Sequence, residues 1–127
     1  MKRKNLKPYI AIIILAAGQS TRFGRNKLLE KLKGRALIER LVSEASRSQA
    51  DEVVVVTGYD SHHIEEALKG HPCRIVFNEG YIRGQSSSVK KGLSAVEGVA
   101  DAVMILPGDV VLVDSTIIDV VIKEYIK

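Results

Sequence analysis

Four short apolar runs, separated by segments with helical periodicity, constrain the fold of this chain more than any other feature. The runs are rich in valine and isoleucine and cover Tyr9 to Ala16, Glu52 to Thr57, Cys73 to Phe77 and Ala102 to Leu106. They lack strict alternation with polar residues, which is typical of strands that are buried on both faces. The sequence therefore predicts a parallel sheet covered by helices on both sides.

The segments after these runs are expected to form the helices. Leu37, Leu41 and Ala45 share one face of the first, and the others are expected near residues 61–68, 86–95 and 115–127. Asp60 and Asp114 are candidate N-caps of the second and fourth helices, and Gly70 follows the second. This alternation predicts an α/β fold, three-layer and Rossmann-like, in which ligands bind beyond the carboxyl ends of the strands.

Composition narrows the class of protein. A chain of 127 residues with 46% apolar content is expected to form one domain. Its net charge of +4 suits phosphates, but the cations are interspersed with acids, and the chain has no Trp and only two Phe. Few aromatic platforms are therefore available for stacked bases, so we expect no nucleic-acid partner. The lone Cys73 is interpreted as a structural residue in preference to a reactive thiol. A single cysteine also fits a protein of the reducing cytoplasm.

The N-terminus superficially resembles a signal peptide, because a basic segment, Met1 to Lys4, precedes the first apolar run. The run is short and leads directly into a polar loop, which favours a buried strand. No stretch approaches the roughly 20 apolar residues that are needed to cross a bilayer, so we expect no membrane partner. The sequence indicates a cytoplasmic protein and leaves its oligomeric state open.

The loop after the first strand combines small residues with cations, and it reads Leu15-Ala16-Ala17-Gly18-Gln19-Ser20-Thr21-Arg22-Phe23-Gly24-Arg25-Asn26-Lys27. Small residues let backbone N–H groups approach phosphate oxygens, and the cations neutralise charge. Five residues separate Gly18 from Gly24 and Arg25 follows, so this is not a Walker A loop. Ser20 occupies the second glycine position of the dinucleotide fingerprint, which excludes that motif too. A plain glycine-rich connection would leave Arg22 and Lys27 unexplained.

Two later strand ends carry further polar groups. The third strand is followed by Asn78 and then by Gly84, Ser86 and Ser87 at a helix start, where free N–H groups and hydroxyls could contact a base, or where a serine could simply cap the helix. The fourth strand ends in Pro-Gly-Asp109, and this acid is either a metal ligand or a turn residue.

Taken together, Leu-Ala-Ala-Gly-x-Ser-x-Arg-x-Gly followed by Lys-Leu-Leu, the Asn and Ser-rich segment and the Pro-Gly-Asp turn resemble the MobA-like nucleotidyltransferase family. The similarity is greatest to its molybdenum cofactor (molybdopterin) cytidylyltransferase branch. It implies a fold of the nucleotide-diphospho-sugar transferase type, with residues 1–127 as the N-terminal portion of one NTP-binding domain. It also implies nucleotide contacts from Leu15, Ala16, Ala17, Gly18, Ser20, Arg22, Lys27, Asn78, Gly84, Ser86 and Ser87, and catalytic roles for Arg22, Lys27 and Asp109, with Asp109 binding Mg²⁺.

The implied reaction transfers CMP from CTP to the phosphate of molybdopterin and releases pyrophosphate. CTP is favoured because the guanylyl branch usually carries Leu-Ala-Gly-Gly at the first motif. Guanylyl or other nucleotidyl transfer to a sugar or alcohol phosphate, and a noncatalytic nucleotide-binding module, stay open as alternatives. Relatives continue into a C-terminal part with acceptor contacts and a second metal-binding acid, so we expect a truncated chain. The family usually places Pro shortly after Asp109, whereas Val110 follows here, and Asp114 is expected to cap a helix.

The histidines are not assigned to the site. His62 and His63 are adjacent on a predicted helix and therefore point in different directions, which favours surface positions over a shared ligand face. His71 precedes Pro72 in a predicted loop, has no partner that is visible in the sequence, and is expected to be a turn residue. No nucleophile elbow supports Ser-His-Asp catalysis.

Overall fold

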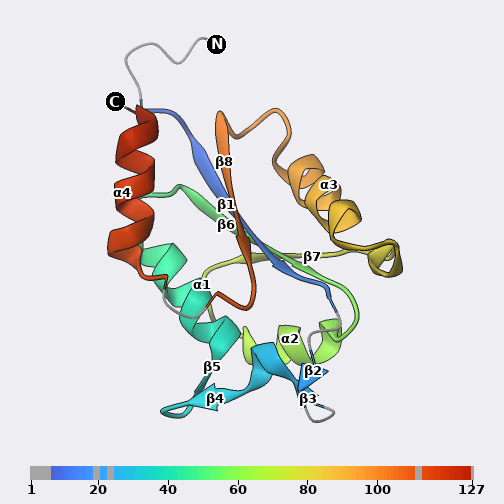
Figure 1. The fold of residues 1–127 in the computed structure, drawn as a ribbon. Helices are drawn as coiled ribbons and strands as arrows, with labels where there is room; N and C mark the ends of the chain where they lie inside the picture. Colours follow the sequence, from blue (N-terminus) through green and yellow to red (C-terminus); the bar gives the residue numbers. More distant parts are fainter. Residues whose placement is uncertain (1–6, 19–20, 23–24, 111–112, 127) are drawn as a thin grey trace.

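The central sheet matches the predicted architecture (Figure 1). The computed structural model describes residues 7–18, 21–22, 25–110 and 113–126. Within them, four parallel strands form one sheet in the order β7-β6-β1-β8, and their bounds are β1 (Ile10–Ala16), β6 (Glu52–Thr57), β7 (Arg74–Phe77) and β8 (Ala102–Pro107). Each predicted strand is present, with its ends displaced by at most one residue.

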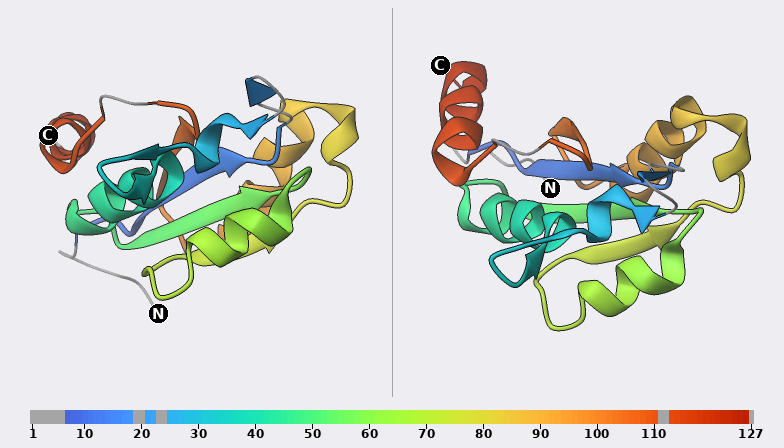
Figure 2. Two further views of the ribbon diagram at one scale, coloured as in Figure 1. Left: turned by 90° about the horizontal axis from the view of Figure 1, so that it is seen from below. Right: turned by 60° about the horizontal axis from the view of Figure 1, so that its bottom comes forward.

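Helices cover both faces of this sheet, as a three-layer fold requires (Figure 2). The helices are α1 (Leu37–Arg47), α2 (Ser61–Ala67), α3 (Gln85–Val96) and α4 (Ser115–Ile126). Buried residues of α1, α2 and α4 pack in one apolar cluster, and those of α3 pack in a second cluster on the other face. In the described part of the chain, no helix is long and apolar enough to cross a membrane.

Strand β1 is central because its side chains supply both clusters. Ile12 and Ile14 belong to the cluster beneath α1, α2 and α4, while Ile13 belongs to the cluster beneath α3, and all three are fully buried. Parallel partners lie on both edges, with Ile13 opposite Val54 on β6 and opposite Ile105 on β8. The continuous apolar run therefore reflects a strand that is covered on two faces and paired on two edges.

The predicted helix ends are partly confirmed. Asp114 caps α4, because its Oδ1 accepts a hydrogen bond from the Ile117 N–H at 2.9 Å. Gly70, beyond α2, adopts a left-handed conformation with φ of 85°. The prediction for Asp60 was wrong in its chemistry: it occupies the N-cap position of α2 but its side chain makes no capping bond. The carboxylate instead contacts Asn26 and His63.

The segment between β1 and α1 contains small elements that the sequence did not predict. These are the antiparallel pair β2 (Thr21–Arg22) and β3 (Arg25–Asn26), the 3₁₀ turn η1 (Lys27–Leu29), and the hairpin of β4 (Lys31–Leu32) and β5 (Arg35–Ala36). A second 3₁₀ turn, η2 (Tyr81–Arg83), precedes α3. These elements shape the path of the chain around the carboxyl ends of β1 and β6.

Gly92 of α3 lies close against the side chains of β1 and β6. A Cβ atom at this position would lie 2.6 Å from Ile13 Cγ2 and 3.2 Å from Val56 Cγ2. We expect Gly92→Ala to lower the free energy of unfolding by about 1–3 kcal/mol, the usual cost of overpacking. Urea denaturation checks this, with Ser94→Ala on the exposed side of α3 as control. Equal stability of wild type and Gly92→Ala would contradict the close approach.

Candidate nucleotide site

A pocket lies where the strand order reverses, between β1 and β8. Chain connections run from β1 through β6 to β7 on one side, and β8 then pairs with the other edge of β1. Open α/β sheets bind ligands at such a point, outside the carboxyl ends of the strands. The cavity has a volume of about 460 Å³ and is lined by Leu15, Ala17, Gly18, Leu28, Tyr81, Ile82, Gly84, Gln85, Ser88, Pro107, Gly108 and Asp109. This volume is in the range of small-molecule sites.

The first wall of the pocket is the start of the predicted phosphate loop. Leu15, Ala16 and Ala17 are buried, and Gly18 is exposed at the bend that follows β1. Gly18 does not adopt a left-handed conformation, and an added Cβ would meet nothing within 4 Å. Among the described residues, neither backbone conformation nor packing therefore requires glycine at this position, and Gly18 lines the pocket.

The remaining loop residues are described only in part. Ser20 lies outside the described residues, and for Arg22 the structure describes the backbone in β2 without the side chain. Lys27 begins η1 and is half-buried, but it is not among the residues that line the pocket. Its neighbour Leu28 does line it. The predicted contacts of Ser20, Arg22 and Lys27 with a nucleotide therefore stay predictions.

The second wall is the start of α3, and here the structure distinguishes between adjacent serines. Gly84 precedes the helix and lines the pocket with Gln85 and Ser88. Ser86 is exposed and Ser87 is half-buried, and neither is among the lining residues. The hydroxyl of Ser87 donates to the Gly84 and Gly80 carbonyl oxygens. Ser87 therefore closes a turn, and the helix has no side-chain cap.

Asn78 is buried next to this wall, and its hydrogen bonds hold the start of α3 in place. The side chain is 4% exposed; its Nδ2 donates to the hydroxyl oxygens of Ser87 and Ser88, each at 3.0 Å, and its Oδ1 accepts from the Gly80 N–H at 3.0 Å. All of these contacts are internal, and Asn78 is not a lining residue. The structure therefore brings Asn78 next to the site in a supporting position.

Ser88 is a site residue that the sequence analysis missed. It is 3% exposed yet lines the pocket, and its oxygen accepts the hydrogen bond from Asn78. None of the described residues accepts its hydroxyl proton. Because the Asn78 amide fixes the oxygen as an acceptor on one side, the O–H is left as a donor for a ligand. The run of three serines indicated that the start of α3 borders the site. Which of the three lines the pocket depends on the geometry of the helix, which places Ser88 there.

The third wall is the turn after β8. Asp109 is exposed and lines the pocket beside Pro107 and Gly108. The Gly108 N–H donates to the Leu15 carbonyl oxygen at 2.8 Å, and a Cβ on Gly108 would lie only 2.6 Å from that oxygen. Glycine is therefore required for this turn to lie against β1. The contact places Asp109 at the same pocket as Gly18.

The donor set suits a hard divalent cation that is shared with a ligand. In the described ranges, no three His, Cys, Asp or Glu side chains are arranged to hold a metal ion. Mg²⁺ commonly binds one or two carboxylates together with waters and substrate phosphates. An exposed carboxylate such as Asp109, facing a pocket with room for phosphates, fits that pattern.

The histidines and the cysteine are not among the residues that line the pocket. His62 and His63 are exposed on α2, as predicted. His71 lies in a bend before β7, as predicted, but it has a partner that the sequence did not reveal, because its Nε2 lies 3.0 Å from Glu39 Oε2 on α1. Burial raises the pKa of the Cys73 thiol, in agreement with its interpretation as a structural residue.

Glu39 gives the fold a dependence on pH. The Ala36 N–H donates to Glu39 Oε1 at 2.8 Å, and this bond, opposed by burial and assisted by His71, lowers the pKa of Glu39. A carboxyl with a lowered pKa stabilises the folded state above its ordinary range, and the stabilisation is lost as the pH falls through the lowered pKa. We expect Glu39→Gln to cost about 1 kcal/mol at neutral pH.

Urea denaturation of Glu39→Gln at neutral and acid pH measures this effect. The difference from wild type should shrink as the pH falls below the ordinary glutamate range. Glu65→Gln, at an exposed position on α2, is the control and should change stability little at any pH. A Glu39→Gln difference that is independent of pH would contradict the role of the carboxylate.

The sequence is similar to a known family of proteins. Residues 12–127 match the model of the MobA-like NTP transferase domain. The bifunctional protein GlmU of Francisella tularensis is 32% identical over 112 residues, which are 87% of this chain and 24% of that protein. The chain thus spans about a quarter of the length of the curated relatives that it matches.

Solved structures share the fold. A nucleotidyl transferase from Methanothermobacter thermautotrophicus is 29% identical with a TM-score of 0.83, and the match covers 91% of this chain and 57% of that one. The Mycobacterium tuberculosis protein Rv0371c in complex with manganese is 20% identical with a TM-score of 0.76, covering 91% and 58%. With the family model matching nearly the whole sequence, this chain belongs to the MobA-like NTP transferase domain family.

Proposed function

We propose that this chain binds a nucleoside triphosphate, with CTP preferred, and transfers the nucleotidyl group to a phosphorylated acceptor with release of pyrophosphate. The observation that carries the proposal is the pocket between β1 and β8. There an unobstructed glycine, the start of α3 and a carboxylate meet in one cavity. The free N–H groups and partial positive charge of a helix start favour an anionic or acceptor-rich ligand.

Two buried residues favour a pyrimidine base. Ala17 is buried and lines the pocket, and it has a side chain where the guanylyl motif has glycine. The Ser88 hydroxyl is a donor without a described acceptor, which suits a carbonyl oxygen on the base edge. These features agree with the resemblance of the Leu-Ala-Ala-Gly motif to the cytidylyl branch.

In the proposed reaction, an acceptor phosphate oxygen attacks the α-phosphorus of the triphosphate. A new P–O bond forms as the bond from the α-phosphorus to the bridging oxygen of the β-phosphate breaks, and pyrophosphate leaves with the electron pair. Such transfer depends on alignment and on neutralisation of charge. Lys27, Arg22 and the N–H groups after β1 would supply positive charge, and no covalent enzyme intermediate is required.

A divalent ion would be held by Asp109 and the triphosphate together. When bound, it neutralises phosphate charge and polarises a P–O bond. We propose Mg²⁺; the manganese in the related Mycobacterium tuberculosis structure supports a divalent ion at this fold. The proposed acceptor is molybdopterin, supported by the family resemblance, and other phosphorylated acceptors are alternatives to it.

The proposal is tested by thermal unfolding with CTP, GTP, ATP, UTP and NAD, each with and without MgCl₂. A ligand at about 100 times its dissociation constant stabilises by roughly 2.7 kcal/mol, which is readily measured. We expect the largest Mg²⁺-dependent increase in unfolding temperature with CTP. We also expect pyrophosphate to be released when molybdopterin is added to the protein with CTP and MgCl₂. Binding of a triphosphate without release of its pyrophosphate in the presence of any acceptor would favour a noncatalytic nucleotide-binding module, and stabilisation by no triphosphate would contradict the proposal.

Ala17→Gly tests the choice of base. The substitution removes the side-chain carbon of a residue that lines the pocket, so we expect the preference for CTP over GTP to fall by about tenfold, the scale of one methylene-sized discrimination. Competition binding with the two nucleotides measures the ratio. Ala67→Gly at the end of α2, outside the pocket, is the control and should leave the ratio unchanged. An unchanged ratio in Ala17→Gly would mean that this residue does not select the base.

A further inference from the structure

Asn26, the residue before Lys27, is a buried bridge between two parts of the chain. It is 8% exposed, and both ends of its amide are bonded. Its Oδ1 accepts from the Leu28 N–H at 2.9 Å and its Nδ2 donates to Asp60 Oδ2 at 3.1 Å. The first bond starts the η1 turn, and the second ties that turn to the residue before α2. With both ends satisfied, the amide favours one orientation and fixes the chain through Lys27.

Asp60 directs its carboxylate toward this bridge instead of toward its own helix. It makes no capping bond to α2; Oδ2 accepts from Asn26, and Oδ1 lies 2.6 Å from His63 Nδ1. Burial alone would raise the pKa of Asp60, but the hydrogen bonds from His63 and Asn26 outweigh burial and the pKa is lowered. The carboxylate is therefore ionised and held on both oxygens at neutral pH.

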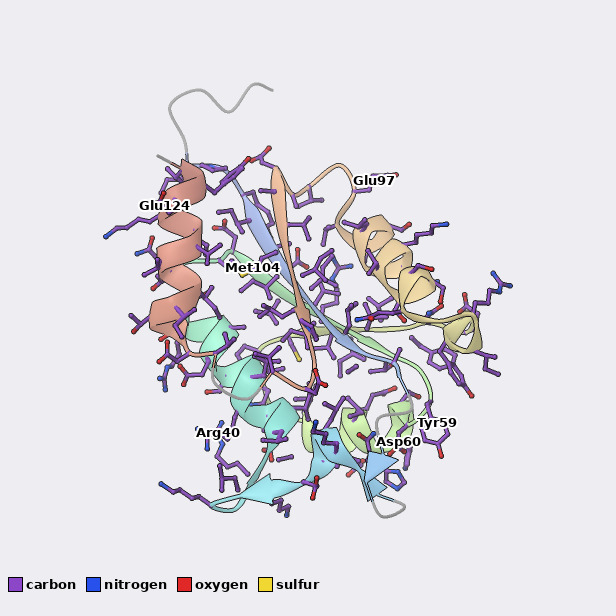
Figure 3. All side chains as sticks on the ribbon, viewed as in Figure 1. Arg40, Tyr59, Asp60, Glu97, Met104 and Glu124 are labelled. Carbon is purple, nitrogen blue, oxygen red and sulfur yellow. The ribbon has the colours of Figure 1, made fainter. Side chains whose placement is uncertain are left out.

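The segment before α2 also contacts the other end of the phosphate loop. The Tyr59 N–H donates to the Ala17 carbonyl oxygen at 3.1 Å. Figure 3 shows Tyr59 and Asp60 next to one another, close to β2 and β3. Ala17 lies near the start of the loop and Asn26 near its end, so Tyr59 and Asp60 are bonded to both ends of the loop.

We propose that Asp60 is a positioning residue for Lys27 and acts through Asn26. The inference rests on the proposed function, because that function assigns Lys27 to charge neutralisation during nucleotidyl transfer. Asp60 need not touch the nucleotide. It keeps the turn of Lys27 fixed before the substrate binds, and a preorganised cation avoids a reorganisation cost during the reaction.

Kinetics of pyrophosphate release test the proposal in wild type, Asp60→Ala, Asp60→Asn, Lys27→Ala and the double variant Asp60→Ala/Lys27→Ala. We expect Asp60→Ala to lower kcat by about 10–100-fold, the scale of one lost hydrogen bond to a charged group, with a smaller change in KM. Asp60→Asn keeps an acceptor for Asn26 and should recover most of the rate. In the Lys27→Ala background, Asp60→Ala should cause no further loss. Additive losses in the double variant would overturn the proposal.

Hydrogen exchange at the Leu28 amide provides a readout that does not require turnover. This N–H is bonded to Asn26, so Asp60→Ala should increase its exchange rate by about tenfold or more through local opening. Glu65→Ala on the exposed side of α2 is the matched control and should not change it. If wild type releases no pyrophosphate, the proposed function fails on its own, while unchanged Leu28 exchange in Asp60→Ala overturns the positioning role in either case.

Discussion

Lys27→Ala is expected to lower the rate of pyrophosphate release by about 10²–10³-fold, the usual cost of removing one preorganised donor that contacts charge developing in a transition state. The ammonium group belongs to the first residue of the η1 turn, and a hydrogen bond to the buried Asn26 fixes this turn. Binding of CTP should weaken less than turnover, because the backbone after β1 and the start of α3 would still hold the nucleotide.

Single-turnover measurements with saturating CTP and MgCl₂ separate this loss of rate from a loss of binding. Lys31→Ala is the matched control: it removes the same charge four residues later, at an exposed position in β4. We expect its rate to stay within about threefold of wild type, as for a surface charge that is screened by solvent. Equal rates in Lys27→Ala and Lys31→Ala would remove Lys27 from the mechanism.

The sheet could be predicted because burial on two faces leaves a direct trace in composition. Ile13 and Val55 lie in strands that have helices on both sides, so no polar residue interrupts the runs around them. The hairpin of β4 and β5 leaves no such trace. Its turn places Lys33 and Gly34 at φ of 55° and 83°, and lysine is not a residue that usually signals a left-handed turn.

The sequence was enough to predict which segments border the candidate site. It was not enough to predict which side chains of those segments line the pocket. Gly18, Gly84 and Asp109 follow strand ends, and the topology of a parallel sheet brings such positions together. Which serine faces the pocket depends on the rotation of α3, so Ser88 could not be separated from Ser87 by sequence alone.

Long-range polar pairs were also beyond the reach of the sequence. Asp60 has the residue type and position of an N-cap, yet its carboxylate bonds to Asn26, 34 residues earlier. His71 likewise meets Glu39, 32 residues away, only because α1 packs near the loop before β7. Local rules describe the competition between a side chain and its own backbone, and tertiary partners can change the outcome.

Asp109→Asn is expected to remove the Mg²⁺-dependent part of CTP binding. The substitution keeps the size of the side chain, and position 109 is exposed, so the fold should be unaffected. What is lost is the negative charge, and a divalent ion shared between the protein and the triphosphate would lose its protein anchor. At a CTP concentration about 100 times the wild-type dissociation constant, stabilisation of roughly 2.7 kcal/mol should fall to the value measured without MgCl₂.

Thermal unfolding with CTP, with and without MgCl₂, distinguishes this loss from general damage to the protein. Asp114→Asn is the matched control, because it makes the same chemical change five residues later at the N-cap of α4, where Asn and Asp are about equally favourable. This variant should retain the full Mg²⁺-dependent stabilisation by CTP. If Asp109→Asn retained it as well, the ion would be held by other groups, and the carboxylate at the end of β8 would have only the role of a turn residue.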